Sequence, residues 1–169
     1  MISAAVLVLF PILVAYAGSS DLFTMTIPNR VSLLLVAAFF AMALAVGMPL
    51  SSLGNHALGG IVVFLPCLIM FSLGWMGGGD AKVASAIAIW FGFGPDLLAF
   101  VLFTAVYGLL LTYGLLVFRF VPVLPGFLAR QDWVFRLHHP KTGIPYGIAI
   151  AAAALHVYSS SQWLGLVSL

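Results

Sequence analysis

The sequence predicts an all-helical membrane protein, a bundle of six transmembrane helices forming one domain over residues 1–169, with the amino terminus outside. Hydrophobic residues make up 64% of the 169 residues and charged residues only 6%. Soluble domains contain about 45 to 50% apolar and about 25% charged residues. A chain this short cannot bury so much apolar surface inside itself, so the excess must face lipid.

The uncharged stretches of the chain define the expected spans, because a crossing helix needs about 20 predominantly apolar residues. The longest stretch, 31–79, is interrupted by Gly47-Met48-Pro49 and by the polar residues 51–55. These residues predict a turn between two helices. The six predicted spans are 3–19, 31–48, 56–75, 80–94, 96–118 and 143–166.

The fourth predicted span is short. At a rise of 1.5 Å per residue it reaches only about 22 Å, against a hydrocarbon core of about 30 Å. We therefore expect it either to tilt little or to be recessed. If it is recessed, its first residue, Asp80, would lie below the membrane surface.

The basic residues indicate the orientation, because cytoplasmic loops are enriched in Lys and Arg. With the amino terminus outside, all six of them fall inside: Arg30, Lys82, Arg119, Arg130, Arg136 and Lys141. The alternative of a cleaved signal peptide ending near 15–17 lacks the positive charge that precedes such a segment.

Composition also excludes several classes of function. The net charge of +2 comes from scattered residues, without the basic stripe of a nucleic-acid binder. Cys67 is the only cysteine, which excludes an internal disulfide and any CxxC metal site. The histidines, His56, His138, His139 and His156, lack metal-ligand spacing. We expect neither a metal nor another cofactor.

The four acids are all aspartates, and two of them are candidates for catalysis. Asp21 and Asp80 are predicted at the inner ends of the first and third spans. If they meet, the two carboxyls would share one proton, and the pair could hydrolyse an amide bond with water. Alternatively, Asp80 caps the fourth helix and Asp21 is a solvated loop residue. We interpret Asp96 as a helix cap on the outer side and Asp132 as part of an interfacial helix or lid.

Asp80 follows Gly77, Gly78 and Gly79. Three glycines leave the backbone bare and permit positive φ, so a substrate strand could approach there. Because a helix N-terminus favours the ionised carboxylate, Asp80 is the better candidate for the base. Lys82 either orients the chain or pairs with Asp80.

Three stretches together resemble the type IV prepilin peptidases, which are membrane aspartic proteases with a GxGD motif. They are Asp21 with Ile27-Pro28-Asn29, then Gly77-Gly78-Gly79-Asp80-Ala81-Lys82, and Gly143-Ile144-Pro145-Tyr146-Gly147. The chain is most similar to the small form that serves Flp (Tad) pili, the CpaA/TadV type.

The resemblance implies that Asp21 and Asp80 are the catalytic pair. Pro28 and Asn29 would match the loop of that family, and Pro145, Tyr146 and Gly147 its short motif beside the active site. It further implies cleavage of a prepilin, between a charged leader and an apolar helix, at the cytoplasmic face of the bacterial inner membrane. Larger members methylate the product and carry an extra domain. Only about ten residues separate the first two predicted spans, so no methyltransferase domain is expected.

Two other classes of function remain open at this stage. In an ion- or proton-coupled transporter the same aspartates would bind a cation or relay protons. In a noncatalytic scaffold both aspartates would tolerate replacement. Proteases that cut archaeal preflagellins or signal-peptide remnants share the same GxGD chemistry.

Overall fold

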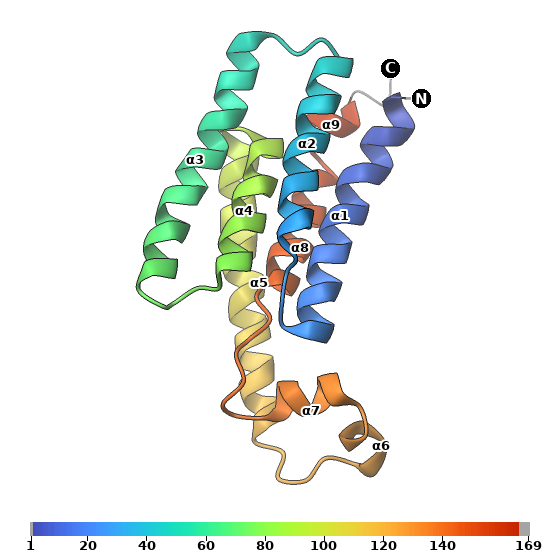
Figure 1. The fold of residues 1–169 in the computed structure, drawn as a ribbon, viewed down its shortest axis with the longest axis vertical. Coiled ribbons are helices and arrows are strands. Elements are labelled where there is room, and N and C mark those ends of the chain that lie inside the picture. Colours follow the sequence, from blue (N-terminus) through green and yellow to red (C-terminus); the bar gives the residue numbers. More distant parts are fainter. Residues whose placement is uncertain (1, 166–169) are drawn as a thin grey trace.

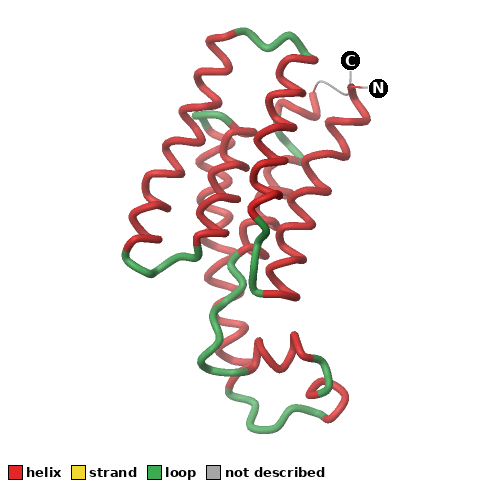
Figure 2. Tube along the Cα trace, viewed as in Figure 1, coloured by secondary structure: helices red, strands yellow, loops and turns green. Residues whose placement is uncertain are grey.

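The computed structural model describes residues 2–165, and within this range the chain forms helices and no strand (Figures 1 and 2). The predicted all-helical fold is therefore confirmed. The helices, in chain order, are α1 (Ile2–Thr24), α2 (Asn29–Ala45), α3 (Leu50–Ser72), α4 (Gly78–Phe91), α5 (Pro95–Arg119), α6 (Gly126–Ala129), α7 (Asp132–His138), α8 (Gly147–Tyr158) and α9 (Gln162–Gly165).

Helix α4 lies at the centre of the bundle, and α2, α3, α5 and α8 all pack against it (Figure 1). Most of its side chains are buried, and many of these are alanines, including Ala81, Ala84, Ala86 and Ala88. Such small side chains let neighbouring helices approach closely, as in other membrane helix bundles. The first turn of α4, which carries Asp80, is thereby held between several helices.

An aromatic cluster secures the far end of α4. Trp90 is fully buried and donates from its indole nitrogen to the carbonyl oxygen of Leu35 at 3.0 Å. Trp163, in α9, donates in turn to the carbonyl oxygen of Trp90 at 2.7 Å. The ring of Phe10 stacks on Tyr158 with centroids 4.3 Å apart. Buried indole N–H groups need such partners. The two hydrogen bonds tie α2 and α9 to the central helix, and ring contacts of Trp90 with Phe10 and Tyr158 join α1 and α8 to it.

Three described helices are long and apolar enough to cross a membrane, with spans at Leu7–Thr24, Leu50–Ser72 and Pro95–Arg119. Helices α2 and α8 are apolar but shorter. Six crossings and an outer amino terminus remain predictions.

Several predicted boundaries are wrong. The first helix continues to Thr24 instead of ending at 19, and α3 begins at Leu50, so the polar residues 51–55 are helical. The chain reverses within the four residues 46–49 instead, where Gly47 has a φ of +67°. The last predicted span, 143–166, is also wrong as one helix. Its first residues are loop, α8 ends at Tyr158, and a turn separates it from α9.

The segment between α5 and α8 lies beyond the bundle at the end of α5, where α7 runs across the bundle axis (Figure 1). Arg119 holds this segment by donating to the carbonyl oxygens of Leu137, Thr142 and Gly143 at 2.9 to 3.0 Å. Helix α7 reaches back to α1, because Arg136 donates to the carbonyl oxygen of Phe23 and the ring of Trp133 meets that of Phe23 edge-on. The predicted interfacial helix or lid thus corresponds to α6 and α7.

Candidate active site

Asp21 and Asp80 lie at the same end of the bundle. Asp21 is in the last turn of α1 and only 6% exposed, whereas Asp80 is in the first turn of α4 and partly buried. The loops that follow α1 and precede α4 lie at this end (Figure 2). Both acids lie near one buried side chain, Ile27, which is close to Gly147, the partner of Asp21, and to Gly79, the neighbour of Asp80. The structure therefore brings together the two acids singled out in the sequence.

Hydroxyl groups determine where α1 ends. Thr24 donates to the carbonyl oxygen of Ser20 at 2.7 Å, and Ser20 donates to that of Thr26 at 2.9 Å. The helix then stops at Met25, which has a φ of +56°. A non-glycine residue in this conformation marks a fixed turn. As a result Asp21 belongs to the helix and is not a solvated loop acid, which corrects that alternative.

The start of α8 binds Asp21 directly. The backbone N–H of Gly147, the first residue of α8, donates to Oδ2 of Asp21 at 2.7 Å. Helices α1 and α8 approach closely because Gly18 has no side chain, and a Cβ there would lie 2.8 Å from Cβ of Ala151. The sequence did not single out Gly18, whose small size next to an acidic residue is the available signal.

Ile27 fills the space between the starts of α8 and α4. It is buried, although it lies in the loop between α1 and α2. A Cβ on Gly147 would lie 2.9 Å from Cδ1 of Ile27, and one on Gly79 would lie 3.3 Å from its Cβ. The glycines at both helix starts therefore make room for one buried apolar side chain. An isoleucine among polar loop residues was the sequence signal for this role.

The triple glycine acts through its missing side chains. Gly77 is the N-cap of α4, and the Asp80 carboxyl turns back to its backbone N–H. A Cβ on Gly77 would lie 2.9 Å from Oδ2 of Asp80. Gly77 has a φ of −69°, and none of these three glycines has a positive φ, so backbone freedom is not what they supply. Asp80 is the third residue of α4 and not its N-cap, which corrects the capping alternative.

Two helix N-termini thus meet at the acid pair. Asp80 lies in the first turn of α4, and Asp21 accepts a hydrogen bond from the first residue of α8. The positive end of a helix dipole stabilises a nearby carboxylate. Asp21 also lies in the last turn of α1, where the negative end of the helix dipole opposes this stabilisation. That Asp80 is the base stays a prediction.

The other motif residues surround the pair. Lys82 donates to Oδ1 of Asn29 at 2.9 Å, so its described partner is an amide and not Asp80. Pro28 is the N-cap of α2. Pro145 is fully buried, and the ring of Tyr146 lies against Gly108 of α5, where a Cβ would be only 2.5 Å from Cε1 of the ring. These contacts fix the starts of α2 and α8 beside the acids.

The remaining candidates lie elsewhere. Asp96 is in the first turn of α5 but is not its N-cap, Gly94, and no side chain caps that helix, so the predicted cap is wrong. Asp132 is exposed at the start of α7. Cys67, in contrast, lies within electrostatic range of Asp80, a position that its sequence context did not indicate. Among the described residues, no group of three or more His, Cys, Asp or Glu side chains could hold a metal ion.

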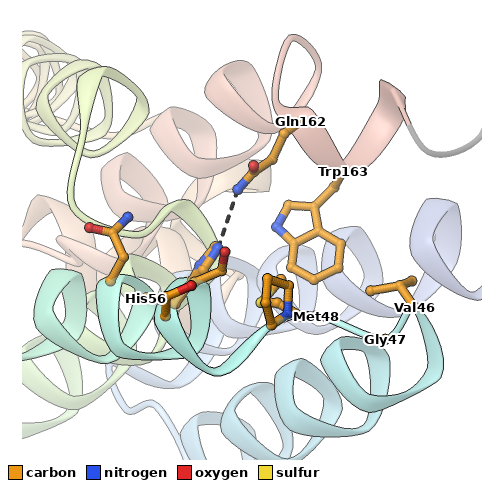
Figure 3. Close-up of a pocket in the computed structure, with 10 residues that line it drawn as sticks. Val46, Gly47, Met48, His56, Gln162 and Trp163 are labelled. Atoms are coloured by element: carbon orange, nitrogen blue, oxygen red, sulfur yellow. Dashed lines mark hydrogen bonds between the residues drawn. The ribbon is translucent and has the colours of Figure 1, made fainter.

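A polar pocket of about 540 Å³ lies at the opposite end of the bundle, at the α2–α3 turn. Figure 3 shows His56, Gln162 and Trp163 around it. Nδ1 of His56 is 2.6 Å from the carbonyl oxygen of Ile89, and its Nε2 is 3.3 Å from the side-chain nitrogen of Gln162. This buried histidine is satisfied by its neighbours, and the pocket contains neither acid of the candidate site.

An apolar helical bundle in which two of the four aspartates lie together at one end is the architecture of a membrane protein with a carboxylate site. The comparisons agree with this class. The model of the type IV leader peptidase family matches residues 8–115. This is more than half of the chain and includes Asp21 and Asp80, so the protein belongs to the type IV leader peptidase family. Pro145, Tyr146 and Gly147 lie outside the matched range.

Membership of this family supports a leader peptidase function and suggests a membrane-bound hydrolase with a prepilin substrate. It does not favour the transporter alternative. No curated protein and no solved structure matches the chain.

Proposed function

We propose that this protein is an aspartic endopeptidase of six membrane spans that removes the leader from type IV prepilins, of the Flp type, at the cytoplasmic face of the bacterial inner membrane. The observation that carries the proposal is the location of Asp21 and Asp80 around Ile27 at one end of the bundle, in a chain of the type IV leader peptidase family. The orientation follows from the basic residues, which would place this end of the bundle inside.

Both acids take part in the proposed reaction. Two carboxyls at short range favour sharing one proton, because two adjacent negative charges repel. The ionised member removes a proton from a water molecule, whose oxygen attacks the carbonyl carbon of the substrate. The protonated member donates its proton to the carbonyl oxygen. When the C–N bond breaks, the amine leaves with the proton that was taken from water, and one hydroxyl of the intermediate returns its proton to the other carboxylate. This chemistry uses no metal and no covalent intermediate.

The surroundings hold the acids in place for this reaction. Asp21 is fixed by the N–H of Gly147, and Asp80 by the N–H of Gly77. The two residues come from different helices, and Ile27 packs against both Gly147, which binds Asp21, and Gly79, which precedes Asp80. A site fixed in this way loses little entropy on reaching the reactive arrangement.

The test is co-expression with a type IV prepilin that has a charged leader, followed by gel analysis of the precursor. We expect complete processing by the parent chain and loss of processing in Asp21→Asn and Asp80→Asn. Asp96→Asn, at the start of α5, is the matched control and should process normally. Thermal unfolding in detergent checks that each variant is folded. Processing that persists in a folded Asn variant would remove that aspartate from the mechanism.

A further inference from the structure

A groove of about 610 Å³ runs between α2 and α3. Its floor is formed by α4, through Ser85, Ala86 and Ile89, and its walls include Phe40 of α2 and Phe64 of α3. Both phenylalanines are at least 40% exposed although they are large and apolar. An exposed apolar groove on a membrane bundle faces lipid and admits an apolar occupant.

The shape of the groove gives it a direction. Helices α2 and α3 both pack on α4 and are joined by the short turn at 46–49. Figure 1 shows them diverging from that turn toward the end at which α4 begins. The lining of the groove runs from Phe40 and Ala57, on the side of that turn, to Asn29 and Lys82, near the start of α4.

The end of the groove nearer the start of α4 is polar, and neither Asp21 nor Asp80 lines it. Lys82 and Asn29 line the groove there and are hydrogen-bonded to each other. Lys82 is two residues from Asp80, and Asn29 is two residues from Ile27. The lysine amine has three donors, of which Asn29 takes one. The others can hold carbonyl or carboxylate oxygens of a chain that leaves the groove.

We propose that this groove is the docking site for the apolar helix of the substrate, and that Lys82 and Asn29 hold the segment where the helix ends. The inference rests on the proposed function. Inside a membrane a peptide must satisfy its own backbone and so enters as a helix, whose peptide bonds are not accessible to water. The bond to be cut therefore has to lie just beyond the helix end. The acid pair is located at that end of the groove.

The floor favours a helix over an acyl chain as the occupant. Of the small residues that line the groove, Ala57 is exposed, whereas Ser32, Gly60 and Ser85 are buried within the bundle. A helix that packs over Ala57 can approach α3 closely, and close packing is a source of attraction between helices in lipid. An acyl chain would fill the apolar part but would gain nothing from the adjacent acids.

The first experiment fills the groove. Ala57→Trp adds an indole to an exposed lining position on α3, and Ala105→Trp adds one to an exposed position on α5 that does not line the groove. We expect Ala57→Trp to raise the KM for a type IV prepilin by about tenfold or more, since the docked helix loses its contacts. Ala105→Trp should process like the parent. Parent-like KM values in both variants would overturn the groove while leaving the proposed function intact, whereas an inactive parent would overturn both.

The second experiment identifies the occupant. A photo-crosslinking amino acid replaces Phe64 in the groove or Leu109 on the exposed face of α5, in the Asp80→Asn chain co-expressed with the same prepilin. We expect an adduct with the apolar helix of the precursor from position 64 and none from position 109. Adducts with lipid alone at position 64, or equal precursor adducts at both positions, would overturn the docking site.

Discussion

The backbone N–H of Gly147 donates a hydrogen bond of 2.7 Å to Oδ2 of Asp21, joining the start of α8 to the last turn of α1. A side chain on Gly147 would collide with its partner, because a Cβ would lie 2.8 Å from the same oxygen and 2.9 Å from Cδ1 of Ile27. One backbone group therefore fixes a proposed catalytic acid, and only glycine leaves room for the contact.

Gly147→Ala should therefore impair the site. Overpacking of this kind costs about 1 to 3 kcal/mol, and the added methyl would push the Asp21 carboxyl away from the amide. We expect prepilin processing to fall by about tenfold or more, since about 1.4 kcal/mol corresponds to a factor of ten. Gly143→Ala is the control, because a Cβ there meets nothing within 4 Å. Equal processing rates in the two variants would contradict the positioning role of Gly147.

Gly77 and Gly78 should differ in their tolerance of alanine. A Cβ on Gly77 would lie 2.9 Å from Oδ2 of Asp80, whereas one on Gly78 would lie 3.1 Å from the ring of Phe71. That ring is half exposed and can rotate away. We expect Gly77→Ala to reduce processing strongly with little change in thermal stability, and Gly78→Ala to have a much smaller effect. A larger loss in Gly78→Ala would show that the site depends on the backbone of the motif and not on space around Asp80.

Arg119 should stabilise the segment that leads into α8. It donates to three carbonyl oxygens, those of Leu137, Thr142 and Gly143. Hydrogen bonds from a charged group contribute about 1.5 to 3 kcal/mol, so Arg119→Gln should lower the free energy of unfolding by at least about 1.5 kcal/mol. Arg119→Lys should rescue only part of the loss, since an ammonium lacks the planar fork of arginine.

Thermal unfolding in detergent measures this effect. Arg130→Gln is the matched control, because Arg130 is exposed. If both glutamine variants unfold at the same temperature, Arg119 does not hold the segment.

Trp90 should be the strongest single anchor of the bundle core. It is fully buried and bonded to α2 and α9 through Leu35 and Trp163. Replacing a buried tryptophan by alanine costs about 3 to 5 kcal/mol, so Trp90→Ala should lower the unfolding temperature markedly. Trp75→Ala removes an indole that is 74% exposed and should change stability by no more than about 0.5 kcal/mol. Similar unfolding temperatures for the two variants would show that Trp90 is not the main anchor of the bundle core.

The sequence by itself determined the helical class, the approximate positions of the first five long helices and the two acidic candidates. Composition and uncharged runs are sufficient for this. In lipid every backbone N–H and C=O group must be hydrogen-bonded within the protein, and a helix achieves this within a single segment. The sequence also predicted that Asp21 and Asp80 lie at one end of the bundle, since they follow the inner ends of the first and third predicted spans. It misplaced the end of α1 and the start of α3. Hydroxyl-to-carbonyl hydrogen bonds extend α1 beyond the predicted end, and the short turn at 46–49 lets α3 begin before the polar residues 51–55.

Only the tertiary structure decided how the acids are held and what adjoins them. The bond between Gly147 and Asp21 joins residues far apart in the chain, and Ile27 and Gly18 matter only because α8 and α4 pack beside them. The uncharged residues after 142 gave no sign that α8 would end at Tyr158. Uniformly apolar segments carry little positional information, so packing between helices determines which side chains meet.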